Sequence, residues 1–224
     1  MYFSKVSLQN SMQAKESLVN LRKNGAYASH QLLWRLFPDE EQRQFLFREE
    51  LATNGLPVFF MLSKKTPKNS SSQFDIQTKA YLPKLRQGDR LAYKLRVNPT
   101  ICLTSKTGKS KRHDVLMHAK HQAKQEGVTD AVVLKQRMLQ AAQGWMANDR
   151  RLNEWGFQLD IVPDIESHTQ HRVSRPKGHL IQYSSVDMQG ILTVSNPAQL
   201  IDKLALGFGK SKAFGCGLMM IRRI

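Results

Sequence analysis

The sequence predicts an α+β fold made of two tandem ferredoxin-like βαββαβ units. Strand-like and helix-like segments alternate along the chain, and a similar order of segments recurs in its two halves. The 224 residues suit one large domain or two domains of about 100 residues each. Hydrophobic residues make up 41% of the chain, which is enough to form a core, so the composition does not indicate disorder.

The first unit is expected to cover residues 1–97. Residues 2–8 alternate in polarity as a strand does. A helix is expected at 26–37, because apolar and aromatic side chains recur there at i, i+3, i+4 and i+7. Strands are expected at 45–51, 56–62, 74–80 and 90–97, before the turn signal of Asn98 and Pro99. No helical period is found between residues 62 and 74, so the second helix of the unit lacks support.

The second unit is expected to cover residues 98–224. A long helical pattern at 128–148 precedes a strand at 157–162, and residues 180–183 and 190–195 are typical of two further strands. Residues 197–206 predict a helix with Pro197 in its first turn. The chain ends in a Gly-rich loop and a strand at 218–224, so the second half repeats the order of the first.

The charge of the chain indicates its class of partner. There are 34 Lys and Arg against 18 Asp and Glu, which gives a net charge of +16 with neutral His. A compact and strongly basic protein most often binds nucleic acid. No apolar run suits a membrane span or a signal peptide, so no membrane association is expected. Cys102 and Cys216 form neither a CxxC pair nor a disulfide framework, which fits a reducing cytoplasm.

Two basic segments could contact phosphates. Segment 104–114 is expected to be an exposed loop, and segment 166–179 resembles a hairpin with a basic tip. Such a tip would suit the groove of an A-form RNA stem, or its rim. The alternative is a surface loop whose charge only adds to the general field. The cations concerned are Lys106, Lys109, Lys111 and Arg112 in the first segment, and Arg172, Arg175 and Lys177 in the second.

A Gly-rich segment near the C-terminus also contains lysines. It includes GKS, but Leu204 stands where a Walker A motif needs glycine, and a helix precedes the loop, the reverse of a P-loop. Two interpretations stay open: a turn whose backbone closely approaches a phosphate, and a turn that only closes the sheet. The residues concerned are Gly207, Gly209, Lys210, Lys212, Gly215 and Gly217.

Tyr27 and His30 form a candidate catalytic pair. Three residues apart, they share one face of the expected helix. A histidine can exchange protons near neutral pH, and a tyrosine hydroxyl can donate a hydrogen bond to a developing oxyanion. A histidine on a helix is often structural, so the spacing alone does not decide between the two roles.

A metal site is the less favoured chemistry. Asp114, His118 and His121 would share one helical face and could bind an ion such as zinc. The neighbouring Lys120 and Lys124 oppose a dication, and no second cluster completes four ligands. We therefore expect neither a metal ion nor another cofactor.

Four stretches of the chain together resemble one known family. They read MYFSKVSL, YASHQLLWRLFPDEEQRQFLFREE, LAYKLRVNPTICLTSKTGKSKRHDV and GILTVSNPAQLIDKLALGFGKSKAFGCGLMMI. In combination they resemble the CasE-type CRISPR repeat endoribonucleases, which are subunits of the type I-E Cascade complex. Residues 116–150 depart from the family pattern, being longer and richer in His and Lys. The resemblance implies two ferredoxin-like (RRM-like) domains with RNA on a basic face across their junction.

The resemblance also implies an activity. The family cuts precursor CRISPR RNA at the 3′ base of a repeat stem-loop, without metal, and stays bound to the product. His30 matches the catalytic histidine, and Tyr27 matches an accompanying tyrosine of some members. Attack by the ribose 2′-OH would give a 2′,3′-cyclic phosphate and a 5′-OH, with His30 moving one proton and loop lysines holding charge. The implied partners are CRISPR RNA and other Cascade subunits, with target DNA met only through the complex.

The alternative function is a non-catalytic RNA-binding subunit with tandem RRM-like sheets. Such sheets usually carry RNP aromatic residues that stack on bases, and the sequence has no RNP1 string. This favours an RNA surface made of helices and loops over an open sheet. Cleavage of repeat RNA in EDTA would distinguish the two functions.

Overall fold

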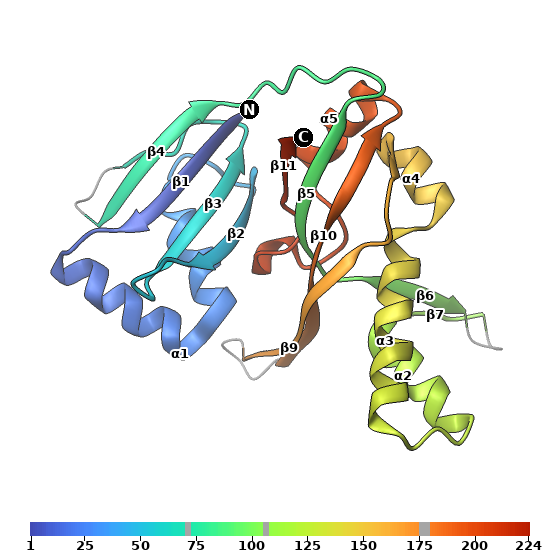
Figure 1. Cartoon of the computed structure of the whole chain (residues 1–224). Coiled ribbons are helices and arrows are strands. Elements are labelled where there is room, and N and C mark those ends of the chain that lie inside the picture. The colour runs from blue at the N-terminus through green and yellow to red at the C-terminus, as the bar shows by residue number, and fades with distance from the viewer. Residues whose placement is uncertain (70–72, 105–107, 175–179) are drawn as a thin grey trace.

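Two antiparallel sheets lie side by side in this protein, and each carries its helices on one face (Figure 1). The computed structural model describes residues 1–69, 73–104, 108–174 and 180–224. Each sheet follows the strand order of a ferredoxin-like fold, so the predicted α+β class and the two tandem ferredoxin-like domains are confirmed. Across the described residues, no helix combines the length and the hydropathy needed to cross a membrane.

The described residues of the first unit form one helix and four strands in the sheet order β2-β3-β1-β4. Residues 64–69 and 73, the described part of the β3–β4 connection, contain no helix, as the missing helical period indicated. The elements are β1 (Tyr2–Leu8), α1 (Met12–Trp34), β2 (Phe45–Leu51), β3 (Pro57–Ser63) and β4 (Phe74–Ala80).

Helix α1 begins at Met12, well before the expected start near residue 26. Ser11 caps it, because its Oγ accepts a hydrogen bond from the backbone N–H of Ala14 at 3.2 Å. Good helix formers follow, but few of them are buried, so this first part has no clear apolar period. The second part packs Leu33 against Phe47 and Phe59 in the core of the unit.

The second unit repeats the ferredoxin-like order as β11-β5-β10-β8, with β9 paired to β10. Its core lies between this sheet and the helices, with Trp145, Trp155 and Phe208 among its large side chains. The elements are β5 (Arg90–Val97), β6 (Thr100–Thr104), β7 (Ser110–Asp114), α2 (Val115–Gln125), α3 (Ala131–Met146), α4 (Asp149–Trp155), β8 (Phe157–Leu159), β9 (Asp164–Ser174), β10 (Leu180–Val194), α5 (Pro197–Leu206), the 3-10 helix η1 (Lys212–Phe214) and β11 (Met219–Arg223).

Three details of the expected organisation differ in the structure. Strand β5 pairs with β10 and β11, so a boundary at residue 97 would cut a strand from its own sheet; we propose that the units divide within residues 81–89. Within the expected loop at 104–114, residues 110–114 form β7, which pairs with β6. The strands expected at 180–183 and 190–195 are one strand, β10, because β9 continues the ladder along it.

Charged residues join the two sheets at their junction. Arg48 of β2 is only 3% exposed, and its Nη2 lies 3.1 Å from Oδ1 of Asp187 on β10. Arg96 of β5 donates to both carboxylate oxygens of Asp187, at 3.0 and 3.1 Å. The same guanidinium donates to the backbone carbonyl oxygen of Glu49 at 2.8 Å. A buried, paired carboxylate therefore fixes the second sheet against β2 of the first unit.

Candidate active site and RNA interface

Helix α1 is broken at Gly25, immediately before the candidate catalytic residues. Gly25 has φ 53° and ψ −140°, a conformation that favours glycine, and helical geometry resumes after it. Tyr27 and His30 therefore lie in the first turns of a second helical segment. Ser29, between them, is fully buried, and its Oγ donates to Glu49 Oε2 at 2.6 Å. This hydrogen bond ties the segment to β2, and through Glu49 and Arg96 to the second unit.

His30 is half-buried beside aromatic rings. Its ring centroid lies 5.4 Å from that of Trp34 and 6.0 Å from that of Phe45. Its Nε2 atom is buried and forms no hydrogen bond with any part of the chain that the structure describes. Burial lowers the pKa of His30, and the charge of Arg43 lowers it further. The imidazole is therefore neutral at pH 7 and has a ring nitrogen able to exchange a proton.

Arg43 is a candidate site residue that the sequence analysis missed. It is half-buried, and its Nη1 donates to the carbonyl oxygen of Phe45 at 2.9 Å, which holds the guanidinium in place. Its charge acts on both His30 and Lys212 of the Gly-rich loop. Arg43 is therefore close both to the candidate proton-transfer group and to Lys212. In the sequence, Arg43 stands in a polar turn and has no feature that separates it from other surface cations.

Tyr27 has different neighbours from His30. It packs against buried residues of the second unit, among them Val173, Tyr183 and Cys216. The structure thus places both side chains on one helical segment, one facing the core of the first unit and the other the second unit. Tyr27 joins the helix to the β9–β10 hairpin, and its part in catalysis stays a prediction.

The Gly-rich loop packs between the two units. An added Cβ at Gly207 would lie 2.7 Å from Leu46 of β2, and one at Gly217 would lie 2.8 Å from the carbonyl oxygen of Phe208. Gly215 is also buried, whereas Gly209 is half-buried. These contacts support the interpretation that the loop closes against the sheet. Contact of Gly207, Gly209, Gly215 and Gly217 with RNA stays a prediction.

The two lysines of this loop differ in their surroundings. Lys210 is exposed, whereas Lys212 is half-buried and its Nζ donates to the carbonyl oxygen of Leu206 at 2.5 Å. Burial lowers the pKa of Lys212, and the charges of Lys203 and Arg43 add to the effect. Since η1 packs against α1, Lys212 belongs to the neighbourhood of the catalytic segment.

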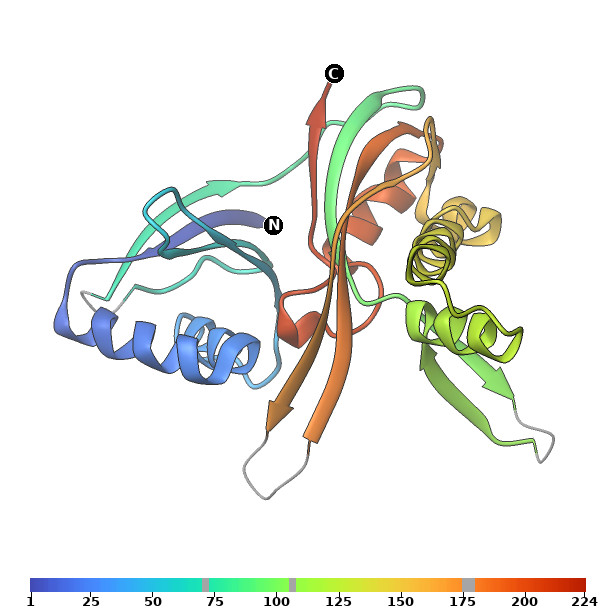
Figure 2. The same ribbon diagram turned by 60° about the horizontal axis from the view of Figure 1, so that its bottom comes forward.

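The β9–β10 hairpin runs past α1, as Figure 2 shows. Arg172 is exposed, but it lies within β9 opposite Gln182 and not in the tip, where we expected it. The ladder extends that far because residues 164–174 pair continuously with β10 apart from one irregularity at Asp187. Arg175 and Lys177 lie outside the described residues. The hairpin that the basic segment predicted is thus present, and its RNA contacts stay a prediction.

The other basic segment lies far from His30. Lys109, Lys111 and Arg112 are exposed on and beside the β6–β7 hairpin, and Lys106 is outside the described residues. Figures 1 and 2 both place this hairpin across the β9–β10 hairpin from α1. These cations are therefore not brought to the catalytic segment. They could only contact a distant part of a bound RNA.

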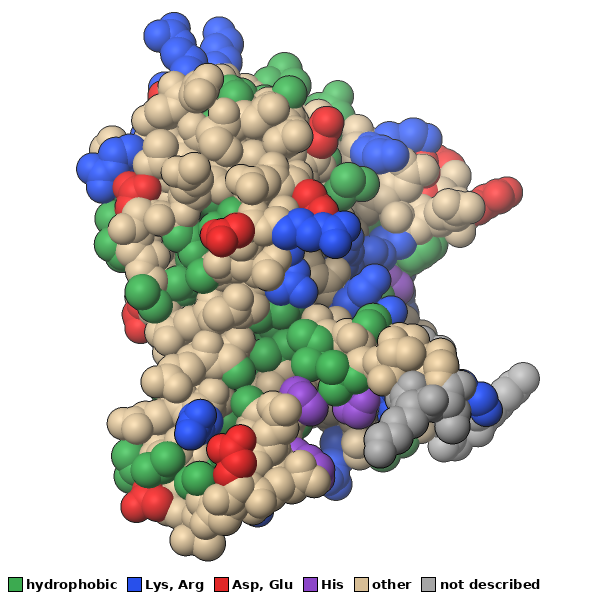
Figure 3. Space-filling model, turned by 90° about the vertical axis from the view of Figure 1, so that its right-hand side faces the viewer, with side chains coloured by type: hydrophobic (Ala, Val, Ile, Leu, Met, Phe, Trp, Pro, Cys, Tyr) green, Lys and Arg blue, Asp and Glu red, His purple; other side chains and the backbone are tan. Residues whose placement is uncertain are grey.

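No metal site emerges from the candidate ligands. Asp114 is the N-cap of α2, where Oδ1 accepts a hydrogen bond from the backbone N–H of Met117 at 2.9 Å. Within the described ranges, no group of three His, Cys, Asp or Glu side chains is arranged to hold an ion. Histidine side chains gather on the lower part of the face that carries the β6–β7 hairpin and helices α2–α4, and Lys and Arg side chains lie mostly above them (Figure 3).

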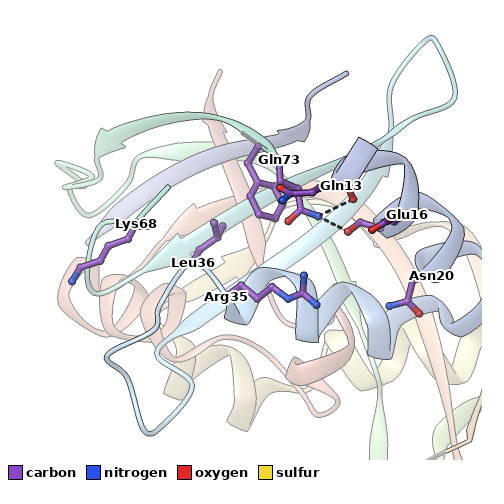
Figure 4. A pocket seen from close by; sticks show the side chains of 9 residues that line it. Gln13, Glu16, Asn20, Arg35, Leu36, Lys68 and Gln73 are labelled. Atoms are coloured by element: carbon purple, nitrogen blue, oxygen red, sulfur yellow. Dashed lines mark hydrogen bonds between the residues drawn. The ribbon is translucent and has the colours of Figure 1, made fainter. Parts of the chain in front are cut away.

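A pocket on the first unit is separate from this site. It lies between the first part of α1 and the start of β4, and neither Tyr27 nor His30 lines it (Figure 4). Gln73 crosses it and donates to the carbonyl oxygen of Gln13 at 3.4 Å and to the hydroxyl of Ser17. The pocket has no arrangement suited to proton transfer, so it does not compete with His30 as the candidate active site.

Comparisons with known proteins agree on one family. The model of the family described as CRISPR associated protein matches residues 1–223. The Cascade subunit CasE of Escherichia coli K12 is 29% identical over 198 residues, which cover 87% of this chain and 90% of CasE. The CRISPR-associated endoribonuclease Cse3 of Thermus thermophilus is 29% identical over 153 residues, 64% of this chain and 60% of Cse3.

A solved structure extends the similarity to the fold. Thermus thermophilus Cse3 bound to an RNA that represents a pre-cleavage complex superposes with a TM-score of 0.71. The superposition covers 99% of this chain and 98% of the other, at 24% sequence identity. At that identity the likeness establishes the shared fold.

Proposed function

Because this chain belongs to the CRISPR-associated protein family, we propose that it is a metal-independent endoribonuclease that cuts precursor CRISPR RNA at the base of the repeat stem-loop. The observation that carries the proposal is the half-buried His30, whose Nε2 forms no hydrogen bond in the described chain and whose pKa is lowered by burial and by the charge of Arg43. The names of its relatives, a Cascade subunit and an endoribonuclease, support the same activity.

The reaction begins at the ribose 2′-OH upstream of the scissile phosphate. Neutral His30 accepts the 2′-OH proton as general base while the oxygen attacks phosphorus. The bond to the 5′ oxygen breaks, and that oxygen takes up a proton from solvent water. A 2′,3′-cyclic phosphate and a 5′-OH result. Such a proton transfer contributes roughly 10²–10⁴-fold to the rate. A lowered pKa suits this role, because the base form then persists to mildly acidic pH.

The cations near His30 stabilise the charge that develops on phosphorus. Arg43 is anchored by Phe45 and can offer its remaining N–H groups in a fixed direction. Lys212 adds a second charge from the Gly-rich loop. In this proposal Tyr27, at the start of the same helical segment, orients the RNA backbone. Neither step needs a metal ion, because the imidazole moves the proton and the cations hold the charge.

The cut RNA stays bound through the basic β9–β10 hairpin, and the protein acts in the cytoplasm as part of a Cascade complex. Its partners are then CRISPR RNA and the other subunits of that complex, and target DNA is met only through the assembly. The naming of an E. coli relative as a Cascade subunit supports this assignment, as does the net charge of +16.

Incubation with repeat RNA in excess EDTA tests the proposal against a non-catalytic RNA-binding subunit. Specific cutting by the wild-type protein, absent from His30→Ala, is the expected result. Tight binding without cutting in any buffer would favour the non-catalytic subunit. Cutting that stops in EDTA and returns with a divalent ion would refute the metal-independent mechanism and bring back Asp114, His118 and His121 as ligands.

A further inference from the structure

A row of aromatic side chains crosses the first sheet on the face opposite α1, where the rings also pack against a cluster that contains Leu218 of the second unit. Phe3 of β1 has its ring centroid 6.2 Å from that of Phe60 on β3 and 5.8 Å from that of Tyr81, which follows β4. Phe3 lies on this face because it alternates with Val6, which is buried in the core beneath α1. All three rings are half-buried, so each keeps part of its surface exposed.

The strand register sets a lysine beside each of the first two rings. Lys79 of β4 is directly opposite Phe3, and its Nζ lies 6.0 Å from the centre of that ring. Lys5 of β1 is directly opposite Phe60. Both lysines are exposed. Rings and cations therefore alternate across the three adjacent strands β3, β1 and β4.

The row continues into a cationic pocket at the link between the two units. This pocket has a volume of about 240 Å³ and begins at Tyr81. Three cations line it and, among the described residues that do so, there is no carboxylate. They are Lys84, Arg222 and Arg223, and Arg223 also pairs with Asp89 at 3.0 Å. The aromatic row thus leads from the middle of the first sheet toward positive charge on β11.

We propose that Phe60, Phe3 and Tyr81 form a stacking platform for unpaired nucleotides that adjoin the stem-loop in the same RNA. Bases stack on aromatic rings whatever their sequence, while lysines and arginines follow the phosphates. The two phenylalanines stand on β1 and β3, the central strands, from which RRM sheets present their stacking aromatics. The missing RNP1 string does not preclude this, because three separate segments supply the rings.

The alternation of rings with cations selects RNA over a protein as the occupant. An apolar protein partner would leave Lys5 and Lys79 without counter-charges at its interface, whereas a nucleotide pairs each base with one phosphate. The identity of the ligand, RNA, rests on the proposed function, but the platform itself is separate from the catalytic residues. It lies on the opposite face of the first sheet from α1 and His30.

The experiment compares the affinities of two RNAs. One is the repeat stem-loop alone, and the other carries an added unpaired uridine tract of about ten nucleotides, tested on either side of the stem. The double variant Phe3→Leu/Phe60→Leu keeps apolar volume but removes the rings. It should bind the extended RNA about tenfold more weakly and the bare stem-loop as the wild type does. Phe60→Tyr should keep the affinity, and Lys15→Ala, on α1, serves as the charge-loss control.

The outcomes separate this inference from the proposed function. Equal affinity of the wild type for both RNAs, or equal weakening of both by the double variant, would overturn the platform. The platform would also be overturned if the two rings were needed to bind another Cascade subunit but not to bind the RNA extension. A wild-type protein that cuts neither RNA refutes the proposed function, yet the difference in affinity between the RNAs still tests the platform.

Discussion

The two ferredoxin-like units share one strand order and differ in what is attached to it. In the first unit, the only helix of the described residues breaks at Gly25 and carries a half-buried, neutral histidine. In the second unit, two hairpins extend from the sheet region with exposed cations on them. Burial tunes a group for proton transfer, whereas exposure keeps cations available to phosphates. The comparison supports the proposal that the first unit supplies the chemistry and the second unit most of the binding.

Removing the imidazole should have the largest effect. His30→Ala is expected to slow single-turnover cleavage of the repeat stem-loop by about 10²–10⁴-fold. RNA affinity should stay within a few-fold of wild type, because many cations contribute to binding and one neutral group does not. His121→Ala, an exposed histidine on α2, is the matched control and should cleave normally. Cleavage by His30→Ala near the wild-type rate would remove His30 from the mechanism.

The second-largest effect is expected from breaking the contacts of Asp187 with Arg48 and Arg96, which we call the joint between the units. Arg48→Ala removes one partner of Asp187, which keeps both hydrogen bonds from Arg96, and about 1–3 kcal/mol of unfolding free energy should be lost. Denaturant unfolding measures this. Arg150→Ala, which removes an exposed pair with Glu154, should change stability by about 0.5 kcal/mol or less. Equal losses in the two variants would show that the joint is no stronger than a surface pair.

The same joint predicts a dependence on pH. Burial alone would raise the pKa of Asp187, but the hydrogen bond and charge of Arg96, with help from Arg48, outweigh it and hold that pKa below its usual value. The stability from Asp187 is therefore fully present above the pKa of an unfolded aspartate, near 3.9, and is lost as the pH falls through the folded value. The stability difference between wild type and Asp187→Asn should shrink on acidification. A constant difference would contradict this.

The hairpin of the second unit should affect binding and leave the chemistry intact. Replacing Arg172, Arg175 and Lys177 with Ala should weaken binding to stem-loop RNA more than binding to an unstructured strand of equal length. The salt dependence of binding should flatten by roughly 0.7–0.9 log units for each phosphate that the variant no longer neutralises. The matched control replaces Lys109, Lys111 and Arg112 with Ala. If both triple variants weaken the binding of both RNAs equally, the β9–β10 hairpin supplies charge without recognising the shape of the stem.

The smallest expected effect is a shift in the pH profile. With His30 as the base, cleavage should rise with pH through a midpoint below 6.5, because burial and Arg43 lower its pKa. Arg43→Ala removes one of these two causes, so its midpoint should move upward as its maximal rate falls. Rate measurements across the acidic to mildly basic range test this. A rate that falls as the pH rises through that midpoint would make His30 an acid.

Much of this arrangement could be predicted from the sequence, and the gaps have physical causes. Periodic apolar residues predicted most strands and the second part of α1. Strand β7 was expected to be part of a loop, and the first part of α1 is mostly solvated and lacked an apolar period. The strand at 90–97 was predicted, but its pairing with β10 and β11 was not, because the partners of a strand lie far away in sequence. For the same reason Arg43 was missed: its proximity to His30 and Lys212 exists only in the folded chain.

The end groups of the RNA products, measured by mass spectrometry after cleavage in excess EDTA, test the central claim most directly. Attack by the 2′-OH with His30 as the base predicts a 2′,3′-cyclic phosphate on the upstream fragment and a 5′-OH on the downstream fragment. A 3′-OH with a 5′-phosphate would mean that water attacked the phosphate, which would contradict the role assigned here to His30 and the first unit.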